Sequence, residues 1–336
     1  MDNLLKKLVS DEKKIDRKLY SSGPYWNYKN SKAIIEINRT GLDNFRGLNS
    51  GIGTSYADNL VLDVRNEFNV KGRLIGKFLS LPLIKTIFNA QLHATNVHID
   101  RYLKNLSIVY KNNKNVINLL NKYKFEKTTS FGCVQKFIHN KKEFSTRYLE
   151  MADVIDKLGD FFDFSKINSF FEIGGGFGAN IHFLLTNFPN IKKVIYLDTV
   201  PNIYVGTQYL KNFFGNQVKD YLHLRNFNKI DFSLNNELEI LCIPPWLIEK
   251  LGDLNIDHFH NANSFVEMPE NIVKNYCDYL KKLKVKEISL ISYDNFDPKT
   301  TFNPEKLNNF FENKLKVSWF ESLIEVYNRK QIFLTN

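Results

Sequence analysis

Glycines alternate with other residues near the middle of the chain, directly after an apolar run. Residues 170–173 predict the end of a buried strand, and Gly174, Gly176 and Gly178 follow it. Glycine tolerates positive φ and lets a ligand approach the backbone closely. A helix is expected directly afterwards, and its free N-terminal amides suit a carboxylate or phosphate. This order of strand, loop and helix predicts a nucleotide-type cofactor site that includes Gly175.

The spacing of the glycines indicates which cofactor the loop would hold. Dinucleotide enzymes use G-x-G-x-x-G, whereas this chain has G-x-G-x-G after a strand-end Glu172, which favours S-adenosylmethionine. A second apolar run over 193–198 ends in Asp198, with Thr199 beside it, and a carboxylate there can accept hydrogen bonds from both ribose hydroxyls. NAD enzymes share this acid, so Asp198 supports a nucleotide site without selecting the cofactor. A tight glycine turn in an ordinary βαβ unit is the alternative.

Composition excludes several classes of protein. With 43% hydrophobic and 14% aromatic residues in 336, the chain has ample core material but no apolar run long enough for a membrane span. The first residues do not resemble a secretory signal, so we expect a cytoplasmic protein. The net charge of +10 is spread among Asn, Ile and Phe, which argues against nucleic-acid binding, and attraction of an acidic or phosphorylated sugar substrate is an alternative use of the charge. Three widely spaced cysteines indicate neither disulfides nor a metal site.

The chain is expected to divide near residue 140. Residues 1–140 are predicted to be mainly helical, with Leu4, Leu5, Leu8 and Ile15 lining an amphipathic helix that lies outside the core and breaks at 21–24. Helical spacing recurs over 74–123. This region is expected to cap the substrate site or to form a homodimer interface. Between these segments, a glycine-rich loop offers Arg46, Tyr56 and Asp58 as substrate contacts or is a surface turn.

Residues 141–336 are predicted to form the catalytic domain. Strands over 170–173, 193–198, 238–243, 256–261 and 286–293 alternate with helices, which predicts an α/β fold with a Rossmann-like, doubly wound and mostly parallel sheet. Ligands of such sheets lie beyond the carboxyl ends of the strands. Pro245 and Trp246 follow the third strand, and Trp246 is expected either to stack on an adenine or to anchor packing.

At this point the chain resembles the class I S-adenosylmethionine-dependent methyltransferases, and more narrowly a bacterial group of sugar O-methyltransferases. The likeness lies in residues 171–178, in the turn at 244–246 and in 261–268, where Asn261 is followed by Ser-Phe-Val-Glu-Met. His258 and His260 stand where the pattern has apolar residues. The resemblance implies methyl transfer to a hydroxyl of a sugar or nucleotide-sugar in surface polysaccharide synthesis, with S-adenosylhomocysteine as product and Asn261 at the cofactor site.

An alcohol is a poor nucleophile while it keeps its proton, so a general base is expected near the transfer point. Glu267 is the first candidate, although a carboxylate at a helix start can simply interact with the helix dipole. His260 is the second, and a core histidine is its alternative. Asp294, with Asp297, is the third, as a base or as a metal ligand. Three alternative functions remain: methylation of another small molecule, a nicotinamide-dependent oxidoreductase, and a binding or scaffold protein without activity.

Overall fold

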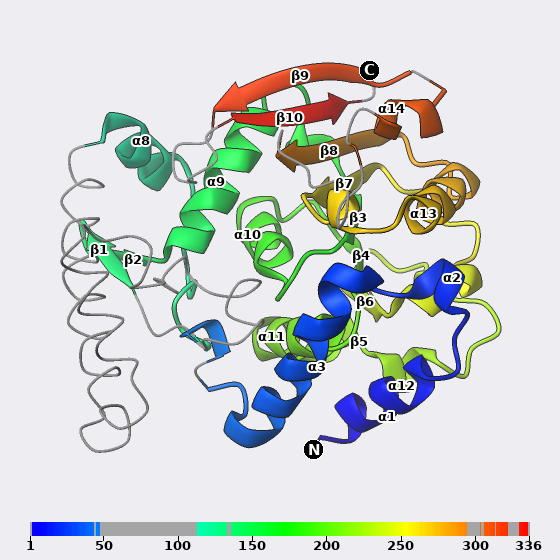
Figure 1. Cartoon of the computed structure of the whole chain (residues 1–336). Coiled ribbons are helices and arrows are strands. Elements are labelled where there is room, and N and C mark those ends of the chain that lie inside the picture. The colour runs from blue at the N-terminus through cyan, green and yellow to red at the C-terminus, as the bar shows by residue number, and fades with distance from the viewer. Residues whose placement is uncertain are drawn as a thin grey trace, which may run out of the picture.

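A single eight-stranded sheet forms the centre of the protein (Figure 1). The computed structural model describes residues 2–43, 45–47, 113–132, 136–293, 303, 306–312, 314–321 and 329–334. The strand order is β5-β6-β4-β3-β7-β8-β10-β9. The strands are β3 (Ser169–Ile173), β4 (Lys193–Leu197), β5 (Val218–Lys219), β6 (Glu239–Ile243), β7 (His258–Ala262), β8 (Glu287–Tyr293), β9 (Lys316–Glu321) and β10 (Arg329–Leu334).

Six strands, β3 to β8, run parallel, and β10 pairs antiparallel with both β8 and β9. Every residue of β3 and β4 is buried, as expected for central strands covered by helices on both faces. The prediction of a Rossmann-like, mostly parallel sheet is confirmed. The short β5 and the antiparallel pair β9 and β10 were not predicted.

Helices alternate with the strands of the sheet from β3 onwards, and two more helices, α8 and α9, precede β3. The helices are α8 (Lys114–Lys122), α9 (Thr146–Leu158), α10 (Ala179–Asn187), α11 (Asn202–Phe214), α12 (Tyr221–Leu224), α13 (Glu270–Lys282) and α14 (Leu307–Phe310). Local sequence explains the ends of α13: Pro269 precedes its first turn, Glu270 opens it, and Lys281 and Lys282 close it, so charges oppose the helix dipole at both ends. No helix within the described ranges is long and apolar enough to cross a membrane.

The N-terminal helices pack onto this domain, contrary to the prediction that they lie outside its core. They are α1 (Asn3–Glu12), α2 (Arg17–Tyr20) and α3 (Gly23–Thr40), and Figure 1 shows α1 beside α12 and α2 near α13. Leu4, Leu5 and Leu8 are buried in the same hydrophobic cluster as the sheet. The expected break at 21–24 starts α3 instead, because Gly23 adopts φ of 76° and Pro24 suits a first helical turn.

A β-hairpin occupies the predicted boundary near residue 140. It joins β1 (Phe137–His139) to β2 (Lys142–Phe144). Asn140 and Lys141 form its two-residue tip with φ of 47° and 66°, the left-handed conformation that a tight hairpin turn requires. Of the helical region expected over 74–123, the structure describes only α8 and its flanks.

Candidate functional site

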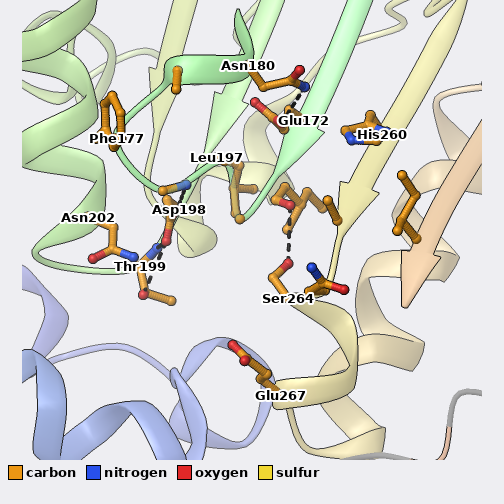
Figure 2. A pocket seen from close by; sticks show the side chains of 18 of the residues that line it. Glu172, Phe177, Asn180, Leu197, Asp198, Thr199, Asn202, His260, Ser264 and Glu267 are labelled. Carbon is orange, nitrogen blue, oxygen red and sulfur yellow. Dashed lines mark hydrogen bonds between the residues drawn. The ribbon is translucent and has the colours of Figure 1, made fainter. Parts of the chain in front are cut away.

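A cavity of about 430 Å³ lies at the carboxyl ends of β3, β4 and β7 (Figure 2). Its floor is the glycine loop after β3, and its sides come from the starts of α10 and α11 and from the segment after β7. Helices α3 and α9 complete the wall. Trp26 and Lys29 lie on α3, and Ser22 directly precedes it. The residues on α9 are Arg147, Glu150, Met151 and Val154. This is the position at which ligands of doubly wound sheets bind.

The glycine loop has the conformation that its sequence predicts. Gly174, Gly176 and Gly178 adopt φ of 77°, 62° and 85°, and Gly178 precedes the first turn of α10. A Cβ on Gly174 would overlap the Ser264 side chain, and one on Gly175 would overlap the Glu172 carboxyl group. The loop therefore needs glycine for close packing as well as for its backbone angles.

Asp198 fixes the loop from the neighbouring strand. Its Oδ2 accepts a hydrogen bond from the Gly176 amide at 2.9 Å, and its Oδ1 accepts one from the Thr199 amide at 2.7 Å. Burial raises the pKa of Asp198 to about 7, although these bonds and one from Asn202 act in the opposite direction. Oδ1 also receives a longer bond from Thr199 Oγ1 at 3.4 Å, whereas Oδ2 has room for a further donor, so the carboxylate can hold the loop and accept from a ligand hydroxyl.

Tyr196 supports the same loop from below. Its hydroxyl donates to the Gly176 carbonyl at 2.5 Å and lies 3.1 Å from the Asn202 carbonyl. On α11, a Cβ at Gly206 would overlap this hydroxyl, so a glycine makes room for the tyrosine. The tyrosine thus couples the glycine loop to the start of α11.

Glu172 lies buried below the loop with only one of its oxygens in use. Asn180 donates to its Oε1 at 2.8 Å (Figure 2), whereas Oε2 has no hydrogen-bond partner among the described residues. Burial raises the pKa of Glu172 to about 8; the Asn180 bond lowers it, and nearby Asp198 raises it. A buried carboxyl group with a free oxygen is ready to bind a cationic or donor group of a ligand.

Other buried polar atoms around the cavity also lack partners within the described ranges. They are Asn180 Oδ1, Asn263 Oδ1 and Arg147 Nε, while Arg147 pairs through another nitrogen with Glu150 at 2.9 Å. All these residues line the cavity. Because buried polar groups are nearly always satisfied, this concentration of unused donors and acceptors indicates a site for a polar ligand.

Asn261 organises the segment after β7 but does not line the cavity. Its amide nitrogen donates to the Ile173 carbonyl at 2.8 Å and to Ser264 Oγ at 2.5 Å, and its oxygen accepts from the Phe265 amide. These bonds tie the end of β3 to the short helix Phe265–Glu267. The side chain therefore acts on the site through the backbone around it.

Glu267 and His260 line the cavity at different ends (Figure 2). The Glu267 carboxylate lies next to the N-terminal helices and accepts a hydrogen bond from Trp26 Nε1 at 3.0 Å. His260 lies on β7 beside Glu172, and its Nδ1 is 2.8 Å from Ser289 Oγ. Burial, together with His258, lowers the pKa of His260 to about 3, so its ring is neutral at physiological pH.

Other predicted residues lie elsewhere. Pro245 and Trp246 do not line the cavity, and the Trp246 ring packs edge-on against Tyr221 at 5.8 Å. Arg46 is buried over the Tyr148 and Phe177 rings, where it donates to Ser145 Oγ, and so does not line the cavity. Asp294, Asp297, Tyr56 and Asp58 lie outside the described residues. Within the described part, no three His, Cys, Asp or Glu side chains cluster as metal ligands.

Several cavity residues were absent from the sequence-based prediction. Trp26 reaches Glu267 across 241 positions of sequence, a contact that no local pattern could indicate. Arg147 and Glu150 are one turn apart on α9, a spacing that also occurs on ordinary solvent-facing helices. Asn180 was predicted only as part of a helix; its position two residues after Gly178 was the available signal.

The chain is similar to known proteins in structure but not in sequence. No protein-family model matches the chain, and no curated protein matches its sequence. Among solved structures, a SAM-dependent methyltransferase from Aquifex aeolicus is similar at 15% identity and TM-score 0.38, over 55% of this chain and 90% of that one. Magnesium protoporphyrin IX methyltransferase from Synechocystis, with bound SAM, shows 12% identity and TM-score 0.38 over 56% and 80%. An O-methyltransferase family protein from Burkholderia thailandensis shows 9% and 0.39 over 57% of each chain.

Proposed function

We propose that the protein is an S-adenosylmethionine-dependent O-methyltransferase whose acceptor is a sugar hydroxyl. The observation that carries the proposal is the glycine loop, closed by Asp198 on one side and by the half-satisfied Glu172 on the other. The proposed cofactor has a ribose diol, a cationic amine and a carboxylate. The loop offers a matching group for each of them.

The residues present fit this cofactor. Asp198 suits a ribose hydroxyl, since its Oδ2 accepts from the Gly176 amide and keeps acceptor capacity. The unpartnered Glu172 Oε2 suits an ammonium group. Arg147 on α9 and the first amides of α10 suit a carboxylate. Bound there, the cofactor would supply an electrophilic methyl group on a sulfonium.

In such a reaction, the protein orients the acceptor and removes the proton of its hydroxyl group. Holding the acceptor oxygen in line with the methyl group can supply much of the acceleration. The wall formed by α3, with Trp26 and Lys29, faces the same cavity, and it is proposed to bind the acceptor with the reacting hydroxyl directed towards His260. The flat apolar face of an indole suits a sugar ring, and its N–H is engaged by Glu267. The sugar assignment rests on this wall and on the resemblance of residues 261–268.

Isothermal calorimetry with S-adenosylmethionine, S-adenosylhomocysteine and NADH tests the cofactor. We expect the first two to bind and NADH not to bind; binding of NADH alone would contradict the proposal.

Turnover is then measured as S-adenosylhomocysteine release with nucleotide sugars and with polysaccharide fragments. Cofactor binding without release on any hydroxyl acceptor would favour the scaffold alternative. Release on a different class of acceptor would retain the methyltransferase and reject the sugar.

Glu267→Gln separates the two base candidates that the structure describes. Glutamine keeps an oxygen that can accept from Trp26, so the fold should be unaffected. A general base contributes about 10²–10⁴-fold to kcat, and a residue that only positions the acceptor acts mainly on KM. We expect a higher acceptor KM with a loss in kcat below about tenfold, measured by initial rates, because Glu267 is proposed to position the acceptor and not to take its proton. A loss of about 10²-fold or more in kcat would identify Glu267 as the base.

A further inference from the structure

A chain of hydrogen bonds crosses β7 and β8 from the protein surface to the cavity. Glu287, whose side chain is 40% exposed, lies 3.2 Å from Nδ1 of His258. Nε2 of His258 and Nδ1 of His260 both lie 2.8 Å from Ser289 Oγ. The strand register explains the geometry, since His258 pairs with Glu287 and His260 with Ser289. His260 then lines the cavity.

The chemistry of each group fixes the direction of these bonds. The Glu287 carboxylate can only accept, so His258 must carry its proton on Nδ1. A neutral His258 then presents a bare Nε2, 2.8 Å from Ser289 Oγ. The serine hydroxyl donates to it in preference to the Phe259 carbonyl, which lies farther away at 3.4 Å. The serine oxygen is left to accept from His260 Nδ1. Nε2 of His260 is therefore a bare nitrogen, and it makes no hydrogen bond to any described residue.

Aromatic packing keeps His258 neutral. The Phe162 ring meets it edge-on at 4.7 Å, the Phe170 ring stacks on it at 5.7 Å, and Phe164 lies at 5.6 Å. This burial lowers the pKa of His258, although Glu287 acts in the opposite direction. A protonated His258 would donate from both nitrogens, and Ser289 would then accept from His258 instead of donating to it. The neutral state of His258 therefore preserves the direction of each hydrogen bond in the chain.

We propose that His258 and Ser289 hold His260 in the tautomer with a bare Nε2, and that this nitrogen takes the proton of the acceptor hydroxyl. The second part rests on the proposed methyl transfer. His258, Ser289 and Glu287 are positioning residues, because they act through His260. The same arrangement of carboxylate and imidazole fixes the working tautomer in hydrolase triads, here lengthened by a serine and a second histidine.

The step balances without another reactant. The acceptor O–H bond breaks and an N–H bond forms at His260 Nε2, while the oxygen forms a bond to the methyl carbon. The S–CH₃ bond breaks and its electron pair stays on sulfur, which becomes a neutral thioether. One positive charge is present before and after, first on sulfur and then on the imidazole. The cavity therefore need not accommodate an additional charge, although burial makes His260 a weak base in the resting protein.

Nitrogen NMR of the ligand-free protein, labelled with ¹⁵N-histidine, tests the tautomers independently of turnover. The spectra of His260→Gln and His258→Gln assign the two rings among the seven histidines. We expect both rings to be neutral and protonated on Nδ1. In Ser289→Ala the His260 ring should shift towards the tautomer protonated on Nε2. A wild-type His260 that carries its proton on Nε2 would overturn the inference, whatever reaction the protein catalyses.

Turnover tests the catalytic part. His260→Gln should lower kcat by about 10²–10⁴-fold, and Ser289→Ala by about tenfold or more, with an unchanged Kd for S-adenosylmethionine. Ser292→Ala is the matched control: it removes a buried hydroxyl from the opposite face of β8 and should keep wild-type kcat. Wild-type kcat in Ser289→Ala or His260→Gln would overturn the role of His260. A wild-type enzyme that methylates no hydroxyl would instead contradict the proposed function and leave the tautomer result standing.

Discussion

Two carboxyl groups of the site are protonated at unusually high pH, and each has a different task. Glu172 and Asp198 have pKa values raised by burial to about 8 and about 7. The Asp198 oxygens accept hydrogen bonds from the Gly176 and Thr199 amides, whereas one oxygen of Glu172 has no hydrogen-bond partner among the described residues. At the residue scale, Glu172 is therefore the carboxyl group of the two that has an entire oxygen atom to offer to a donor or a cation.

The raised pKa of Glu172 makes stability depend on pH. The pKa of Glu172 is about 8 in the folded protein and 4.5 ordinarily. Between pH 4.5 and about 8, the folded protein therefore keeps a proton that the unfolded chain has released. This stability is present in full below pH 4.5 and is lost as the pH rises towards 8. We expect the Tm of the ligand-free protein to fall between these limits, and to fall less in Glu172→Gln, by scanning calorimetry. Equal slopes in both proteins would show that Glu172 titrates normally.

Asp198→Ala tests the ribose contact. Removing a charged acceptor should weaken S-adenosylmethionine binding by about 1–3 kcal/mol, measured by calorimetry. Asp253→Ala is the control, because that carboxylate is fully exposed and remote from the cavity. An unchanged affinity in Asp198→Ala would remove the residue from the cofactor site.

At the scale of elements, Asn261 and Ser264 hold the segment after β7 to the end of β3 through the Ile173 carbonyl. Asn261→Ala removes the side-chain partner of the Phe265 amide and leaves the buried Ile173 carbonyl with only the longer bond from Ser264 Oγ, at 3.3 Å. We expect a loss of stability of about 1–3 kcal/mol in urea unfolding, together with weaker cofactor binding. Asn216→Ala, at an exposed position before β5, should change neither. Wild-type stability in Asn261→Ala would mean that the segment is held by other contacts.

Elements with a strong local signal were predictable from the sequence, and those that depend on distant partners were not. Apolar runs bounded by Gly174 or Pro244 marked strands correctly, because burial on both faces leaves a continuous hydrophobic pattern. The two-residue β5 has too few positions to show a pattern. Trp26 reaches the site through a contact with Glu267, which is distant in the sequence. Trp246 was predicted either to stack on an adenine or to anchor packing, and it packs against Tyr221. Sequence motifs thus predicted the glycine loop and its conformation but not the opposite wall of the cavity.

On the scale of the whole molecule, the N-terminal helices and the sheet share one hydrophobic core. Leu8→Ala should therefore destabilise the entire protein, by about 2–5 kcal/mol, in a single transition followed by circular dichroism. Leu234→Ala is the matched control, since that leucine is fully exposed. Two separate transitions, with only the first affected by Leu8→Ala, would indicate that the N-terminal helices unfold independently.

The hydrogen bond between Trp26 and Glu267 also offers an optical signal. Indole emission responds to nearby charge and solvent, and Trp26 lies in the cavity wall while Trp246 packs away from it. A ligand that enters between α3 and the glycine loop should alter the Trp26 component, and a Trp26→Phe variant identifies that component. Candidate sugars can thus be titrated against the unlabelled protein and ranked by affinity before any product is isolated.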